Sequence, residues 1–88
     1  MITTQEKATI RKLARRYKVR KILLFGSSLI SKKARDIDLG VEGILAKSFF
    51  KFYGDLLFSL PKPVDLVDLS KDSKFTRLVR EEGLAIYG

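Results

Sequence analysis

The sequence contains no cysteine, no histidine and no tryptophan, and only two of its 88 residues are proline. Without cysteine the chain forms no disulfide, carries no thiolate nucleophile and offers no sulfur ligand for zinc. Without histidine it lacks the commonest general base, which excludes Ser-His-Asp and Cys-His catalysis within this chain. Catalysis by these residues would therefore rely on carboxylates, lysines, hydroxyls or a metal ion bound by oxygen.

Long apolar runs are also missing. No run approaches the ~20 residues that span a bilayer, and the first residues, MITTQEKATIRK, lack the apolar core of a signal peptide. We therefore expect a cytoplasmic protein without a membrane segment. At 88 residues, we expect residues 1–88 to form a single domain with one modest core.

Acidic residues are scarce in the first third of the chain. Residues 1–35 hold eleven of the 18 Lys and Arg residues and one acid, Glu6, for a net charge of +10. Residues 36–88 hold seven bases and nine acids, for a net charge of −2. This asymmetry favours a polyanionic ligand, such as nucleic acid or nucleotide phosphates, or an acidic protein partner. Charge alone leaves a merely solvated surface as an equal alternative.

Apolar periodicity predicts alternating helices and strands. A capping-box pair, Thr3 and Glu6, precedes a first helix that runs to about Lys18, and its polar face is basic. Strands are expected at 22–25, 36–41 and 64–69, a loop or short helix at 26–33, helices at 46–60 and around 75–83, and an edge strand in the final LAIYG. The fold class is α/β (α+β), with a small mixed sheet of three to four strands covered by helices in the order α-β-α-β-α-β-α.

Four aromatic residues of the helix at 46–60 fall at helical spacing. We expect them to pack in the core rather than to form a platform for stacking on bases. They are Phe49, Phe50, Phe52 and Tyr53.

Two aspartates, Asp36 and Asp38, lie two positions apart in a predicted strand. Both side chains therefore leave the same face, ~6.6 Å apart along the strand, where their oxygens can converge on one or two cations. Carboxylates without nitrogen or sulfur ligands suit magnesium or manganese.

A third carboxylate is expected from the strand at 64–69. Asp65 and Asp68 are three positions apart and face opposite ways in a regular strand, so only one joins the cluster. We favour Asp65 because it lies inside the apolar run, where a charged side chain is rare unless it is paired or has a function.

Gly26 and Ser27 follow a strand that is apolar on both faces. Glycine lets the backbone approach a ligand closely, and free amides after it favour an anion. A Gly-Ser turn alone is most often a plain tight turn, and an isolated Asp-x-Asp is often a solvated strand edge. Their conjunction, with Asp65 on a later strand, is far more specific.

With this conjunction the chain resembles the minimal nucleotidyltransferases (MNT) of the DNA polymerase beta-like superfamily. The resemblance implies that Gly26 and Ser27 hold a nucleotide triphosphate. It also implies that Asp36, Asp38 and Asp65 are catalytic and bind magnesium, with two ions expected.

The resemblance further implies an enzyme that transfers AMP from ATP to a hydroxyl, that of a tyrosine, on a partner protein. Such MNT proteins are commonly antitoxins paired with a HEPN-type RNase toxin. Many members follow Gly-Ser with Arg-Ala-Arg-Gly, whereas Ser28, Leu29 and Ile30 follow here. Candidates for the missing positive charge at the phosphates are Lys32, Lys33 and Arg35.

Two other functions remain open from the sequence. The chain would also serve as an antitoxin that neutralises its partner by binding alone, without catalysis. It would also serve as a nucleic-acid-binding module through the basic first helix, which carries Lys7, Arg11, Lys12, Arg15 and Arg16.

Overall fold

A computed structural model describes residues 2–31 and 34–88 of the chain. Four helices and four strands follow in the order α1 Thr4–Arg16, β1 Lys21–Phe25, α2 Ser27–Ile30, β2 Ile37–Glu42, α3 Ala46–Ser59, β3 Val64–Asp68, α4 Lys74–Glu82 and β4 Leu84–Tyr87. The predicted element order and mixed sheet are confirmed, and LAIYG supplies the fourth strand.

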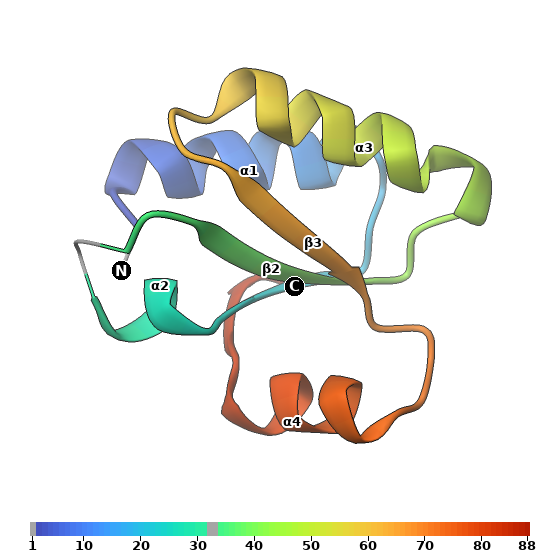
Figure 1. Cartoon of the computed structure of the whole chain (residues 1–88). Helices are drawn as coiled ribbons and strands as arrows, with labels where there is room; N and C mark the ends of the chain where they lie inside the picture. The colour runs from blue at the N-terminus through green and yellow to red at the C-terminus, as the bar shows by residue number, and fades with distance from the viewer. Residues whose placement is uncertain (1, 32–33) are drawn as a thin grey trace.

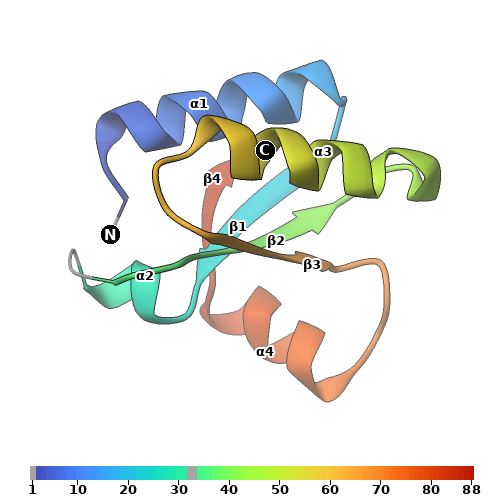
Figure 2. The same ribbon diagram turned by 45° about the horizontal axis from the view of Figure 1, so that its top comes forward.

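The strands form one sheet in the order β3-β2-β1-β4. β1 pairs antiparallel with β2 and with β4, while β2 and β3 run parallel. Helices α1 and α3 lie side by side over one face of the sheet, and α4 covers the other face (Figures 1 and 2). The short α2 lies at one end of the sheet, directly after β1.

The main core lies between the sheet and the pair α1 and α3. Helix α1 begins with the predicted capping box, in which Thr3 and Glu6 each accept a hydrogen bond from the other's backbone amide. Apolar side chains from both helices and all four strands fill this layer; among the largest fully buried are Phe52, Ile10, Ile22, Leu24, Ile37, Leu39 and Leu56. A smaller apolar cluster under α4 contains Leu23, Leu69 and Val79.

One core prediction is wrong. Phe52 is fully buried, and Phe49 and Tyr53 pack against the core, but Phe50 is 80% exposed. Helix α3 rests on the sheet through Phe52 and Leu56, so Phe50 falls on its outer side.

Among the described residues, no helix is long and apolar enough to cross a membrane.

Candidate functional site

Gly26 forms a sharp turn between β1 and α2. Its backbone has φ 70° and ψ −156°, a conformation that is essentially restricted to glycine. A Cβ atom at this position would lie 2.4 Å from Oδ2 of Asp38. The turn therefore requires glycine for two reasons: its backbone conformation, and the Asp38 carboxylate that occupies the space where a Cβ atom would lie.

Ser28 ties this turn to β2. Its hydroxyl donates to the carbonyl of Phe25 at 2.9 Å and accepts from the amide of Asp38 at 3.3 Å. The side chain is only 2% exposed. Ser28 thus fixes the distance between the glycine turn and the carboxylate, while the neighbouring Ser27 is exposed to solvent.

Asp38 and Asp65 lie opposite each other in the register of the parallel strands β2 and β3. Their neighbours Leu39 and Leu66 pack in the core under α1 and α3. Because side chains alternate along a strand, both aspartates point to the opposite face of the sheet, the face that α4 covers in part. Neighbouring strands are ~4.8 Å apart, so the two carboxylates are close.

Asp36 lies just before β2 and is exposed, so the predicted strand start is one residue early. The ladder explains this difference: the pairing with β3 begins at Ile37 opposite Val64, and Asp36 has no partner in that register. It nevertheless lies near enough for its charge to act on Asp38.

The electrostatics of Asp38 reflect this crowding. Burial raises the pKa of the Asp38 carboxyl above its usual 3.8, and the negative charges of Asp65 and Asp36 and a hydrogen bond with Asp65 raise it further. Among the described residues, no lysine or arginine forms an ion pair with these three carboxylates. The site therefore concentrates negative charge that a bound cation would neutralise.

To hold a metal ion without other ligands, a protein needs several suitable side chains close together. In the part of the chain that the structure describes, no group of three or more His, Cys, Asp or Glu residues could hold a metal ion by itself. Oxygen donors suit magnesium, and positive charge is favourable beside carboxylates that lie as close together as those of Asp38 and Asp65. The residues thus fit a cation that takes further oxygen ligands from a bound molecule.

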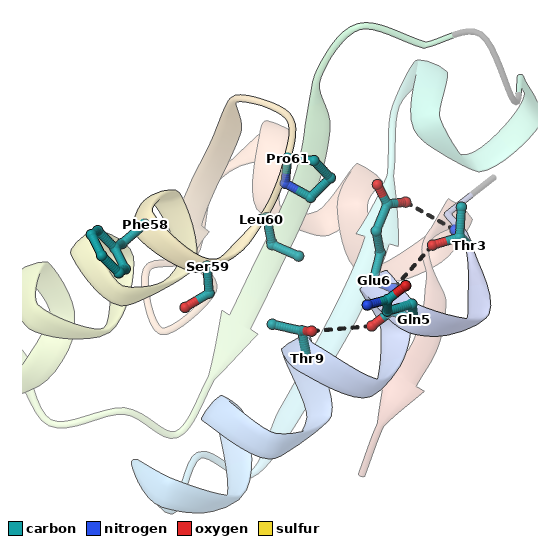
Figure 3. A pocket seen from close by; sticks show the side chains of 8 residues that line it. All are labelled: Thr3, Gln5, Glu6, Thr9, Phe58, Ser59, Leu60 and Pro61. Atoms are coloured by element: carbon teal, nitrogen blue, oxygen red, sulfur yellow. Dashed lines mark hydrogen bonds between the residues drawn. The ribbon is translucent and has the colours of Figure 1, made fainter.

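A second cavity is lined by residues other than these carboxylates (Figure 3). Its volume is about 580 Å³, and it lies between the start of α1 and the end of α3. Its lining contains Thr3, Gln5, Glu6, Thr9, Phe58, Ser59, Leu60 and Pro61, none of which is a predicted site residue.

The matches to known proteins come from solved structures. No protein-family model matches the sequence, and none of the curated proteins matches it either. Solved structures do match. A toxin-antitoxin with AMP-PNP is 29% identical, with a TM-score of 0.77, covering 93% of this chain and 73% of that one. A complex of the tri-AMPylated HEPN toxin of Shewanella oneidensis with MNT antitoxin is 28% identical, with a TM-score of 0.76, covering 99% and 73%.

The predicted resemblance is confirmed: this chain has the fold of an MNT domain. A third match, 26% identical with a TM-score of 0.76 over 93% of this chain and 72% of the other, is a toxin-antitoxin mutant in which two aspartates two positions apart are replaced by glutamate.

Not every predicted site residue of this chain is brought together. Lys32 and Lys33 lie outside the described residues, and Arg35 is exposed directly before Asp36. Asp68, set aside in favour of Asp65, accepts a hydrogen bond from the Ser70 amide at 2.9 Å.

Sequence reasoning missed Ser28 as a structural member of the site. Its position two residues after the glycine was visible, but nothing in the pattern separates a buried bridging serine from an exposed one.

Proposed function

We propose that this MNT domain transfers AMP from ATP to a hydroxyl of a partner protein, and that it acts as an antitoxin to a HEPN-type RNase toxin. The observation that carries the proposal is the register of Asp38 with Asp65, directly beside Gly26. This arrangement places two carboxylates next to a backbone that a phosphate can approach. The proposal places the protein in the cytoplasm, where ATP is available.

In the proposed reaction, the acceptor hydroxyl releases its proton to solvent and its oxygen forms a bond to the α-phosphorus of ATP. The bond between the α- and β-phosphates breaks, and pyrophosphate leaves. Asp36, Asp38 and Asp65 would hold one or two magnesium ions, and such ions neutralise phosphate charge and lower the pKa of an acceptor hydroxyl. The carboxylates need this positive charge, because burial and their mutual repulsion already raise the pKa of Asp38.

The phosphates would lie along the Gly26–Ser27 turn. Gly26 lacks a side chain, so the backbone there can approach an anion closely, and exposed Ser27 offers a hydroxyl donor. Arg35 beside Asp36, together with Lys32 and Lys33, would add positive charge.

The structural relatives support this reading. One was solved with AMP-PNP, a nucleotide analogue, and another contains an AMPylated HEPN toxin. In a third, the two altered aspartates have the same spacing as Asp36 and Asp38. We infer that the acceptor of this chain is a hydroxyl, that of a tyrosine, on a HEPN-type partner.

The test is transfer of AMP to the candidate partner, measured by intact mass after incubation with magnesium and each NTP in turn. We expect a mass increase of whole AMP units with ATP, and none with the Asp36→Asn or Asp38→Asn variant. Asp68→Asn is the matched control: it removes a carboxylate from the same strand as Asp65 and should leave transfer intact. Transfer by both Asp36→Asn and Asp38→Asn would refute the proposal.

A non-catalytic antitoxin is the second candidate. The outer side of α3 exposes Phe50 and Phe58, the latter by 93%, and neither residue lies at the carboxylates. Such exposed aromatic side chains are typical of protein-binding surfaces. If binding alone neutralises the partner, Asp38→Asn would neutralise as well as the unaltered protein, with or without ATP.

Nucleic-acid binding through α1 is the third candidate. Lys7, Arg11, Lys12 and Arg15 line a shallow depression on the outside of this helix. Binding of this kind weakens steeply with salt, because each neutralised phosphate releases a counterion. A flat salt dependence, or binding unchanged in Arg11→Gln with Arg15→Gln, would rule it out.

A further inference from the structure

A small apolar cavity adjoins the proposed phosphate turn. Its volume is about 240 Å³, and it lies between the end of β1, α2 and α4. Gly26 forms part of its wall, so the cavity and the carboxylate site share that residue. The lining is completed by Phe25, Leu29, Phe75, Leu78, Val79 and Glu82.

The walls suit a flat ring. Phe25 and Phe75 meet edge to face, with ring centroids 5.8 Å apart, and present an aromatic surface. Leu78 and Phe75 are 48% and 50% exposed, so α4 leaves apolar surface open to solvent at this point. A planar aromatic group entering the cavity would cover that surface.

The size points to part of a ligand rather than a whole one. Pockets that enclose complete small molecules occupy ~300–1,000 Å³, and this cavity of about 240 Å³ is smaller. The remainder of the molecule would therefore lie outside, and the shared Gly26 wall directs it toward Asp38.

We propose that this cavity holds the base of the nucleotide whose phosphates lie at the Gly26–Ser27 turn. This inference rests on the proposed nucleotidyl transfer. Glu82 is the charged residue of the described lining, and its carboxylate accepts hydrogen bonds only. It therefore favours adenine, whose exocyclic amino group presents two N–H donors, over uracil, which presents only its N3–H.

The experiment compares magnesium-dependent binding of ATP, UTP and inorganic tripolyphosphate, which has no base, by calorimetry. Leu78→Ala shortens an apolar wall and should weaken ATP binding about fivefold while leaving tripolyphosphate binding unchanged. Leu57→Ala is the matched control, because Leu57 is also 48% exposed but lies on α3, over the opposite face of the sheet.

A second set of variants, at Glu82, tests the selectivity for the base. We expect the unaltered protein to bind ATP about tenfold more tightly than UTP, and Glu82→Gln to reduce this ratio, because an amide donates as well as accepts. Glu81→Gln, the neighbouring exposed carboxylate on α4, should leave the ratio unchanged.

The outcomes separate this inference from the function on which it rests. If Leu78→Ala weakens ATP no more than Leu57→Ala does, the base binds elsewhere and the inference fails, while the proposed transfer stands. An equal loss for ATP and tripolyphosphate in Leu78→Ala would also overturn it, since the defect would lie at the phosphates. If the unaltered protein binds neither ligand, the proposed function fails and this inference fails with it.

Discussion

Asp38 occupies a position that opposes its own ionisation. Burial and the charges of Asp65 and Asp36 raise its carboxyl pKa in the folded chain above the usual 3.8. Ionising this carboxyl therefore costs more free energy in the folded chain than in the unfolded chain, and the folded chain holds the proton more tightly. The folded state is therefore less stable at pH 7 than it would be with a neutral side chain there.

Asp38→Asn should accordingly increase the free energy of unfolding at pH 7 by roughly 0.5–1 kcal/mol, after allowance for screening by solvent. The gain should shrink as the pH falls through the raised pKa of the folded chain toward 3.8, and it should be lost below 3.8, because the carboxyl is then protonated in both states. Urea denaturation at pH 7 and at pH 3 measures both values. A variant less stable than the parent at pH 7 would show that Asp38 stabilises the fold.

Gly26 is the second residue whose identity the site fixes. Alanine would force a side chain into a positive-φ conformation and bring its Cβ within 2.4 Å of the Asp38 carboxylate. We expect Gly26→Ala to lower the free energy of unfolding by roughly 1–3 kcal/mol and to abolish ATP binding. Denaturant unfolding and calorimetry test the two effects, and an alanine variant that binds ATP normally would contradict this account of the turn.

At the scale of elements, α3 contains a glycine that the structure does not require. Gly54 lies in the helix, and a Cβ there would meet no atom within 4 Å. Because glycine loses more backbone entropy than alanine in a helix, Gly54→Ala should raise the free energy of unfolding by about 0.5–1 kcal/mol.

The same denaturation series that measures Gly26→Ala serves for Gly54→Ala, so two identical substitutions should shift stability in opposite directions. A destabilised Gly54→Ala would contradict the open surroundings of Gly54 on which this prediction rests.

The elements also show which features the sequence could predict. The buried strand β1 and the alternation in β2 gave their positions to within a residue, because apolar runs report burial directly. Phe50 was misplaced because helical spacing identifies a face only approximately, and α3 carries aromatic residues on two sides.

At the scale of the whole molecule, the fold separates its two charged regions. Helix α1, with its basic outer surface, covers one face of the sheet, while Asp38 and Asp65 point to the other face. From the sequence, this separation of charge was visible only along the chain, as an excess of basic residues in its first third. Which sheet face each region takes depends on the strand order β3-β2-β1-β4, and no local pattern specifies that order.

The candidate site was predictable to a similar extent. Spacing alone predicted that Asp36 and Asp38 lie together. Alternation along a strand allowed only one of Asp65 and Asp68 to join them, and the choice of Asp65 followed from its place inside the apolar run. Sequence spacing did not reveal the pairing of Asp38 with Asp65, the hydrogen bonds of Ser28 or the cavity at Gly26, because each depends on contacts between separate elements.

We propose that Asp36, Asp38, Asp65 and the glycine turn form one binding site for a metal and a nucleotide. Paramagnetic broadening by Mn²⁺, followed in an amide-resolved NMR spectrum with ATP present, tests it most directly. We expect the signals of Gly26, Asp38 and Asp65 to broaden first, and this preference to be lost in Asp38→Asn. Broadening centred on another carboxylate, such as Glu81, or an unchanged pattern in Asp38→Asn would contradict the claim.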